Sequence, residues 1–473
     1  MRTRPFDRED PTILWVSSAA GEGREAGTFD DPFSTIEQAL ERVQAGYAIV
    51  LKSGAYDGDV TFQKSGTYDH PVLITSERGE GAIIREGCWY FYDICDLIVA
   101  DLVFADAPHG AIAVIGKCER NSFAHLEFRN CGTEGKDSCT LYFGGSHAGC
   151  NLVENCGFER RSGNGHVSAA ILIAEGDADA GIGEPNRDHI FRHNHFINYS
   201  YGILVGARDT TRGEYGHIVE CNTFENCSLD GTLIMCGDTT VRGNIFRHCR
   251  RSAITIAAGR GSQIEDNRII DCATGIRTMG DAHTVQNNCI VRSAEQAIHV
   301  ADRTNPERAP SRNIIVERNT CIECGAGAPA SRIAGIRIDR GTTCVLRQNL
   351  VYGVGKPYCI ADLDPKRPGL QPPQCFIDDN AASGGCGILP GMHERAIDFV
   401  SYAGGDFTNN APYGAQGWSA GTGPTAVASF SEWEMPAGEE EEPEDAAYAD
   451  ADESSNESGE ESDEPRVRGL FYE

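Results

Sequence analysis

The sequence lacks any run of about 20 consecutive apolar residues, the length that a membrane-spanning helix requires. It is also poor in positive charge: 41 Lys and Arg stand against 70 Asp and Glu, giving a formal net charge of -29. Recognition of nucleic acid or of an anionic membrane surface depends on Lys and Arg, so this balance disfavours both. The sequence therefore excludes a spanning protein and predicts no nucleic-acid partner.

No apolar segment follows the charged residues Met1 to Pro11, so the start of the sequence does not have the form of a secretory signal peptide. Disulfides persist in oxidising compartments, so we expect the 19 cysteines to be reduced thiols. The sequence predicts a cytoplasmic protein. Non-Sec export or a place in a virion stays open as an alternative.

Acidic charge is concentrated near the C-terminus. Between Glu439 and Glu464 there are 14 acidic residues and no Lys or Arg, so the rest of the chain carries -15 of the net charge of -29. Such a segment buries almost nothing that could offset the entropy lost on folding. The composition predicts an acidic disordered tail over residues 425–473.

A repeat of about 22 residues runs through the middle of the chain. Its mark is an asparagine that recurs with spacings of 28, 22, 23, 21, 31 and 30 residues, where the longer spacings are one repeat plus an insertion. These residues are Asn194, Asn222, Asn244, Asn267, Asn288, Asn319 and Asn349. Short runs of alternating apolar and polar residues lie between them, which is the period of β-strands. The pattern predicts an all-β fold, a right-handed parallel β-helix of about twelve coils.

Stacked coils explain the recurring polar residues. A sharp bend between strands favours left-handed backbone, which asparagine tolerates, so we expect each recurring asparagine to adopt that conformation and to form a ladder. Cysteines recur in the same register and are expected to stack in the core; these are Cys227, Cys249, Cys272 and Cys324. Cys321 and Cys324 form a C-x-x-C, but both fall on repeat positions, so we expect no metal site there.

The flanking segments predict the ends of the solenoid. Residues 30–47 combine a capping Ser34 or Thr35 with one apolar face, which predicts a short helix covering the N-terminal end of the core. We divide the chain into an N-terminal cap with the first strands (1–60), β-helix repeats (61–364), a C-terminal coil with loops (365–424) and the tail (425–473).

The N-terminal motif also carries a family resemblance. Its residues are Gly27-Thr28, Pro32-Phe33, Thr35-Ile36, Ala39-Leu40, Gly54, Tyr56, Lys64 to Thr67, Pro71 and Ile74. In this pattern the chain resembles the pectate-lyase-like β-helix superfamily, nearest to the branch that contains alginate and chondroitin lyases. Residues 406–418 (DFTNNAPYGAQGW) are similar to the closing segment of many such proteins. The resemblance spans about residues 12–420 and implies the same β-helix fold.

The sequence departs from that branch where the catalytic residues would lie. Members carry a Glu-x-Glu calcium pair, then a Lys base, then an Arg on the next coil. Here Met235 and Cys236 stand where the Lys is expected, and no Glu-x-Glu precedes them. Calcium therefore remains a candidate cofactor with no assigned ligands. An acidic loop with Asp177, Asp179, Glu184 and Asp188 has suitable oxygen ligands, but it lacks regular spacing, which favours a solvated loop over a calcium site.

A set of chemically active residues follows from the strand period. If Ile254, Ile276, Ile298 and Ile336 face the core, the residues that follow them face outward and stack on successive coils. These are Thr255, Arg277, His299 and Arg337. Removing the proton beside the carboxylate of an acidic sugar needs a base and a cation.

We therefore predict His299 as the catalytic base and Arg277 or Arg337 as the catalytic residue that holds the carboxylate. Asp302, Arg303, Asp339 and Arg340 are predicted to bind the substrate. The alternative is that the same ladder consists of solvated ion pairs between strands, each worth at most about 1 kcal/mol.

Two functions stay open on the sequence. The first is a carbohydrate-active β-helix protein of the polysaccharide lyase type, acting on a uronic-acid-containing glycan. The second is a non-catalytic β-helix used for glycan binding or structural assembly, as a surface or virion component. A body with a charge of -15 repels polyanions in general, so the first function needs the local cations of the outward ladder.

Overall fold

The computed structural model describes most of the chain up to residue 409. The described residues are 6–20, 26–77, 81–134, 138–145, 148–161, 167–174, 186–206, 215–301, 311–327, 334–339, 342–353, 356–360, 374–383, 392–394, 399–401 and 406–409. Across these ranges, no helix is both long enough and apolar enough to cross a bilayer. The predicted acidic tail lies outside the described residues.

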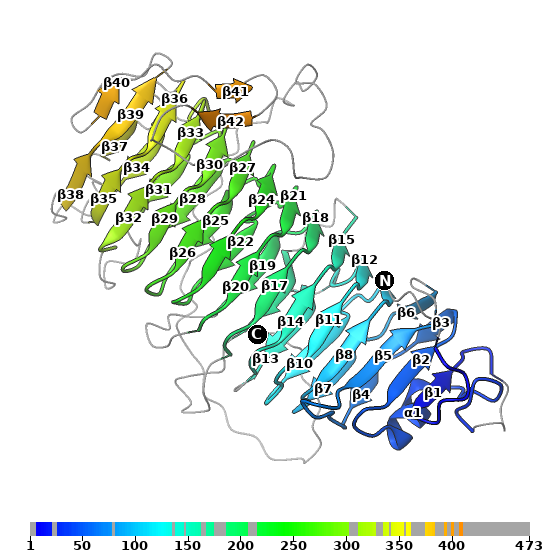
Figure 1. Ribbon diagram of the computed structural model, residues 1–473. Coiled ribbons are helices and arrows are strands. Elements are labelled where there is room, and N and C mark those ends of the chain that lie inside the picture. Colours follow the sequence, from blue (N-terminus) through cyan, green and yellow to red (C-terminus); the bar gives the residue numbers. More distant parts are fainter. Residues whose placement is uncertain are drawn as a thin grey trace, which may run out of the picture.

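Short strands from successive coils stack into three long parallel sheets (Figure 1). The first, sheet A, has 14 strands. They are β1 (Ile13–Val16), β2 (Ala48–Leu51), β5 (Val72–Ser76), β8 (Leu97–Ala100), β11 (Ser122–Ala124), β14 (Leu152–Glu154), β17 (Ile190–Arg192), β20 (Ile218–Glu220), β23 (Thr240–Arg242), β26 (Gln263–Glu265), β29 (Thr284–Gln286), β32 (Ile314–Glu317), β35 (Thr343–Arg347) and β38 (Gln374–Asp378).

Sheet B also has 14 strands, and sheet C has 12. Sheet B consists of β3 (Gly54–Asp57), β6 (Ala82–Arg85), β9 (Val103–Ala105), β12 (Glu127–Arg129), β15 (Gly157–Glu159), β18 (His195–Ile197), β21 (Thr223–Glu225), β24 (Ile245–Arg247), β27 (Arg268–Ile270), β30 (Cys289–Val291), β33 (Thr320–Ile322), β36 (Leu350–Tyr352), β39 (Asn380–Ser383) and β40 (Met392–Glu394). Sheet C consists of β4 (Val60–Phe62), β7 (Trp89–Tyr92), β10 (Ile112–Ile115), β13 (Ser138–Gly144), β16 (Ser168–Ile173), β19 (Tyr201–Val205), β22 (Thr232–Ile234), β25 (Ser252–Ile256), β28 (Thr274–Thr278), β31 (Ile298–Val300), β34 (Ile336–Ile338) and β37 (Tyr358–Ile360).

The interior is built from vertical stacks of like side chains. On sheet B, six phenylalanines on successive coils stack with ring centroids 4.6 to 5.3 Å apart. They are Phe104, Phe128, Phe158, Phe196, Phe224 and Phe246. This spacing is close to the separation of neighbouring strands, so each coil buries the aromatic face of the next. The predicted stack of Cys227, Cys249, Cys272 and Cys324 is confirmed as buried core, and all 18 described cysteines are free thiols.

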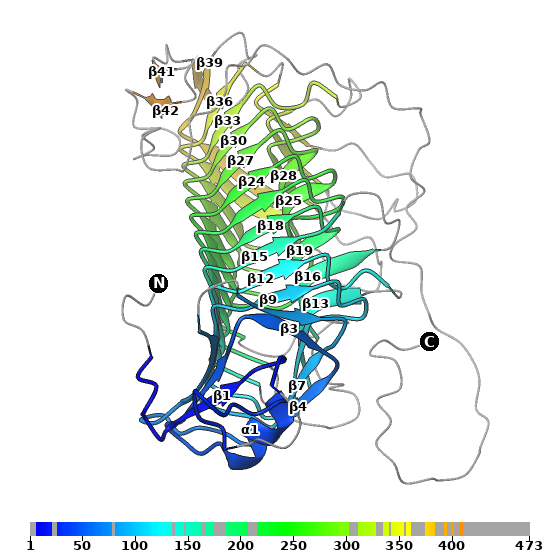
Figure 2. The ribbon, with the colours of Figure 1, turned by 90° about the vertical axis from the view of Figure 1, so that its right-hand side faces the viewer.

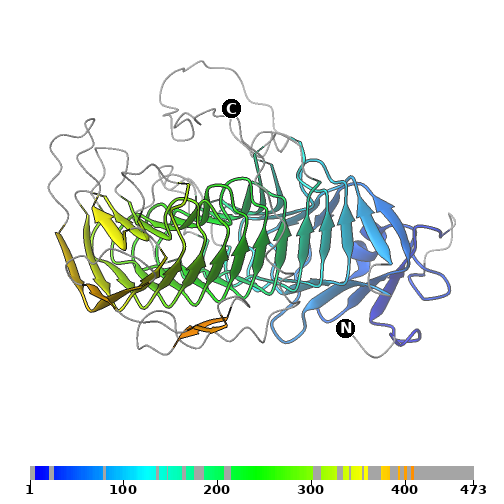
Figure 3. The same ribbon diagram turned by 90° about the horizontal axis from the view of Figure 1, so that it is seen from above.

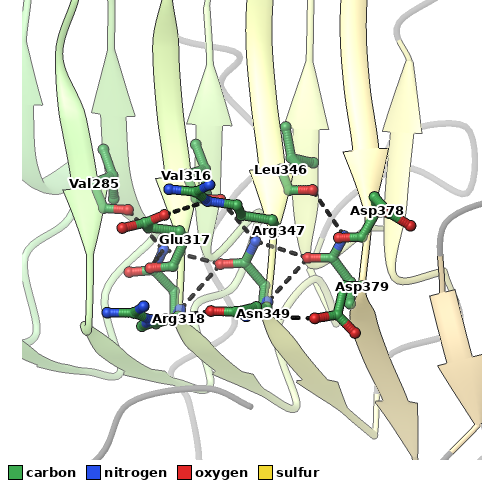
Figure 4. A network of polar contacts seen from close by, with 12 residues as sticks. Val285, Val316, Glu317, Arg318, Leu346, Arg347, Asn349, Asp378 and Asp379 are labelled. Atoms are coloured by element: carbon green, nitrogen blue, oxygen red, sulfur yellow. Dashed lines mark hydrogen bonds and ion pairs between the residues drawn. The ribbon is translucent and has the colours of Figure 1, made fainter. Parts of the chain in front are cut away.

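The asparagine ladder forms at the corner between sheets A and B. Each Nδ2 donates to Oδ1 of the asparagine on the next coil and to a backbone carbonyl; Asn349, for example, bonds Asn380 and Val316, both at 2.9 Å (Figure 4). The ladder is thus confirmed, but its predicted conformation is wrong. Positive φ falls on the residue before each ladder asparagine, as in Asp266 (58°) and Gly243 (63°). The asparagines themselves point inward, where their amides satisfy buried backbone groups.

The N-terminal end of the stack is closed as predicted. Helix α1 (Ile36–Arg42) has Thr35 as its N-cap in a capping box with Gln38, and it buries Ile36 and Ala39. Figure 2 shows α1 beneath the first coils. Near the other end, strands β41 (Phe399–Ser401) and β42 (Asp406–Asn409) pair antiparallel and lie outside the stack (Figures 1 and 3). The fold is a right-handed parallel β-helix.

Candidate functional site

The predicted outward ladder exists on sheet C. Thr255, Arg277, His299 and Arg337 occupy the same position on β25, β28, β31 and β34 and pair in register. The residues on either side of each, such as Ile298 and Val300 beside His299, are fully buried in the core. Because side chains alternate across a strand, the four side chains face outward and lie one strand spacing apart, about 4.8 Å.

Asp339 ties two members of this ladder together. Its Oδ2 lies 3.0 Å from Nε2 of His299, and its Oδ1 accepts a hydrogen bond of 3.0 Å from Nε of Arg337. Asp339 directly follows β34 and lies two residues beyond Arg337, so the strand end positions the carboxylate between two coils. The carboxylate of Asp339, a residue predicted to bind the substrate, thus bridges the histidine and one arginine of the ladder.

His299 faces outward but is 8% exposed, so it is enclosed rather than solvated. Burial lowers the pKa of His299 below its ordinary value; the Asp339 carboxylate opposes this shift, while positive charge on Arg337 and Arg277 adds to it. The ring is therefore neutral at pH 7. Asp339 accepts the proton on Nε2, which leaves Nδ1 with a free lone pair, and no described residue bonds to Nδ1.

Two other ladder atoms are buried without a partner within the described structure. They are Nε of Arg277 and Oγ1 of Thr255. Thr255 is 5% exposed, although its side chain points away from the core. The ladder thus contains a neutral base, two cations and unsatisfied donors within four coils.

The apolar half of the same ladder lies toward the N-terminus. Preceding coils place Leu233, Leu204, Leu172 and Tyr142 at the position of Arg277. Cys236, where the lyase branch would have its Lys, is buried in the core and contacts Thr239 at 3.3 Å. The polar chemistry of sheet C therefore begins at β25.

Three predicted substrate-binding residues, Asp302, Arg303 and Arg340, lie outside the described residues. The same holds for Asp177, Asp179 and Glu184 of the acidic loop. Among the residues that the structure describes, no three His, Cys, Asp or Glu side chains converge as a metal site would require. We therefore assign no residue to calcium and derive no step through it.

Fold and ladder together define the class: a right-handed parallel β-helix protein with a histidine–aspartate pair and cations on one outer face. A family model described as a right handed β-helix region matches residues 180–362. Human fibrocystin-L is 29% identical over 193 residues, which is 41% of this chain and 4% of that protein. The chain thus spans only a small part of this relative.

Several of the similar solved structures are polysaccharide lyases. The PL6 family alginate lyase AlyGC gives a TM-score of 0.62 at 16% identity, covering 85% of this chain and 56% of that chain. A PL6 family lyase from Pseudopedobacter saltans gives 0.58 at 14% identity, covering 75% and 92%. A PL6 alginate lyase in complex with a trisaccharide gives 0.55 at 14% identity, covering 87% and 94%. At these identities the likeness is one of fold, and it agrees with the resemblance in the N-terminal motif.

Proposed function

We propose that this protein is a polysaccharide lyase that cleaves a uronic-acid-containing glycan on the outer face of sheet C. The observation that carries the proposal is the enclosed, neutral His299, whose Nε2 is held by Asp339 and whose Nδ1 is free beside two arginines. The alginate lyases of similar fold support the choice of substrate class.

The reaction is a β-elimination. Nδ1 of His299 takes the C5 proton of the uronate, and the C5–H electron pair becomes the second bond of C4=C5 as the C4–O bond breaks. The leaving oxygen then takes the proton from the imidazolium. Asp339 stabilises that imidazolium through Nε2, and an arginine neutralises the charge that builds on the carboxylate as C5 loses its proton.

Local charge explains how an acidic protein could bind such a glycan. The chain carries -29 overall, which repels polyanions at long range. The ladder carries two arginines, on β28 and β34, and among the described residues one carboxylate, Asp339, bonds to it, so positive charge is locally in surplus. Binding should therefore weaken steeply as ionic strength rises.

The experiment is an assay of the purified protein against alginate, polygalacturonate, chondroitin and neutral glycans, with and without calcium. Ultraviolet absorbance reports the C4=C5 bond, and a separate assay counts new reducing ends. Absorbance that disappears in His299→Gln supports the proposal. Reducing ends without absorbance would indicate hydrolysis and contradict it. Retention on a glycan column without any product would favour the non-catalytic binding protein.

A further inference from the structure

The two arginines of the ladder have different surroundings, and this difference assigns them different roles. Nε of Arg337 donates to Asp339 at 3.0 Å. Nε of Arg277, one coil away on the other side of His299, is buried and has no partner within the described structure. The sequence left either arginine as the residue that holds the carboxylate.

An unsatisfied buried donor destabilises the folded protein, and more so when the group is charged. Such a cost is recovered when a ligand supplies the missing acceptor. On the preceding coil, Oγ1 of Thr255 is a second buried donor without a partner in the described structure, about one strand spacing from the Arg277 position. Two adjacent donors, one of them cationic, match the two oxygens of one carboxylate.

Other unpartnered buried atoms in the described structure do not have this arrangement. Thr232 and Thr278 also have orphan hydroxyls, but they alternate with outward residues and so face the core. Arg160 has an orphan Nη2, but its guanidinium lies 5.8 Å from the centroid of the buried Tyr199 ring, which provides a cation–π partner. Among the described residues, only Arg277 and Thr255 combine an orphan donor with an outward position on the ladder that contains His299.

We propose that Arg277 and Thr255 form a carboxylate subsite, which takes the uronate carboxylate of the sugar whose C5 faces His299. Arg337 is then a positioning residue that orients Asp339. This inference rests on the proposed function and names the group that the site recognises. The geometry fits, because C5 is bonded to the carboxyl carbon, so the base and the carboxylate subsite must be immediate neighbours. Arg277 and His299 are paired on adjacent strands.

The subsite predicts discrimination between charged and neutral sugars. A sugar whose carboxyl has been reduced to a primary alcohol leaves the Arg277 guanidinium without an anionic acceptor. Its affinity should therefore fall by about tenfold to a hundredfold, the range for a hydrogen bond to a charged group. Thr255→Val, which keeps the shape and removes the hydroxyl, should weaken uronate binding by about tenfold.

The test is titration calorimetry on His299→Gln protein, so that no turnover occurs. The probes are trimannuronate, trigalacturonate and the carboxyl-reduced form of each. We expect at least one uronate to bind and its reduced form to bind at least about tenfold more weakly. Adding the substitution Arg277→Gln should weaken uronate binding by at least the same factor. Adding Arg242→Gln, which replaces an ion-paired arginine on sheet A, should leave the affinity unchanged. Thermal melts check that each variant is folded.

The outcomes separate this inference from the proposed function. Uronate binding that needs Arg277 and Thr255, in a protein that cleaves nothing, would support the subsite and refute the lyase. Cleavage with Arg277→Gln at the wild-type KM would support the lyase and overturn the subsite. Equal affinity for the charged and reduced sugars, or no binding of either uronate, would also overturn it.

Discussion

Sheets A and C each present a ladder of charged side chains, but they use their charges differently. On sheet A, acidic and basic or amide side chains alternate from coil to coil. The ladder is Glu154, Arg192, Glu220, Arg242, Glu265, Gln286, Glu317, Arg347 and Asp378. Each arginine pairs with the glutamate of the preceding coil, as in Arg192–Glu154 at 2.7 Å and Arg242–Glu220 at 2.6 Å. Figure 4 shows the same arrangement for Arg347 and Glu317.

On sheet C, His299 and Arg337 share the carboxylate of Asp339, while Nε of Arg277 and Oγ1 of Thr255 have no described partner. Solvated ion pairs between coils thus describe sheet A, whereas the ion pairs that Asp339 makes on sheet C are largely buried. Paired charges favour one register between neighbouring coils, and each pair adds little to the free energy of unfolding. Uncompensated, enclosed donors cost stability, which is the expected mark of a functional site.

The largest effect is expected when the proposed catalytic histidine is replaced and compared with another histidine whose side chain faces outward. His299→Ala should lower the rate of unsaturated product formation by about 10² to 10⁴, because it removes the base. His195→Ala is the control, since His195 also faces outward, on sheet B, and is half-exposed. A wild-type rate in His299→Ala would remove His299 from the mechanism.

The next largest effect is expected on the stability of the protein, from the buried asparagine ladder. Asn267→Ala removes four hydrogen bonds from the core: two that Nδ2 of Asn267 donates, to Val241 O and Asn288 Oδ1, and two that its Oδ1 accepts, from backbone N and Nδ2 of Asn244. The free energy of unfolding should fall by about 3 kcal/mol, measured by urea denaturation. Asn287→Gly, at the left-handed position directly before the ladder residue Asn288, should lower the free energy of unfolding by less than about 1 kcal/mol. Equal effects would mean that the amide ladder does not set the stability of the coils.

A smaller effect tests the carboxylate of sheet C. Asp339→Asn should lower the rate by about tenfold, because the imidazolium loses its counter-charge. The rate requires neutral His299, so it rises as pH passes through the histidine pKa. Asp339 raises that pKa, so its removal should move the acidic limb of the pH–rate profile to lower pH. A shift to higher pH would contradict the assigned role.

The smallest effect is expected on sheet A. Arg242→Gln removes an ion pair whose arginine side chain is 48% exposed, and such pairs are worth at most about 1 kcal/mol. The change in unfolding free energy should shrink further in high salt. A loss of several kcal/mol would show that the paired ladder carries more of the fold than we infer.

The sequence predicted the features that follow from the spacing of the repeat and from the two-residue alternation of β-strands. Asparagine spacing and strand alternation were enough to place His299, Arg277 and Arg337 on one ladder, because register in stacked coils follows from the repeat. The ladder of sheet A was missed, although its signal is regular: a charged or amide residue stands two positions before each ladder asparagine, as Glu265 does before Asn267.

Other features depend on three-dimensional detail that a repeat does not encode. The bridging role of Asp339 depends on side-chain rotamers at a strand end, and the enclosure of His299 depends on what covers the ladder. The left-handed residue was misplaced by one position, because inward asparagines and turn asparagines have the same composition signal.

The most direct test of the difference between the two ladders is the rate of unsaturated product formation in two matched variants, Arg277→Gln and Arg242→Gln. Both remove one arginine from an outer strand face, and both lower the net charge equally. On a uronic-acid polysaccharide that the wild-type protein cleaves, we predict a fall of at least about tenfold for Arg277→Gln and no change for Arg242→Gln. Equal rates in the two variants would contradict the account.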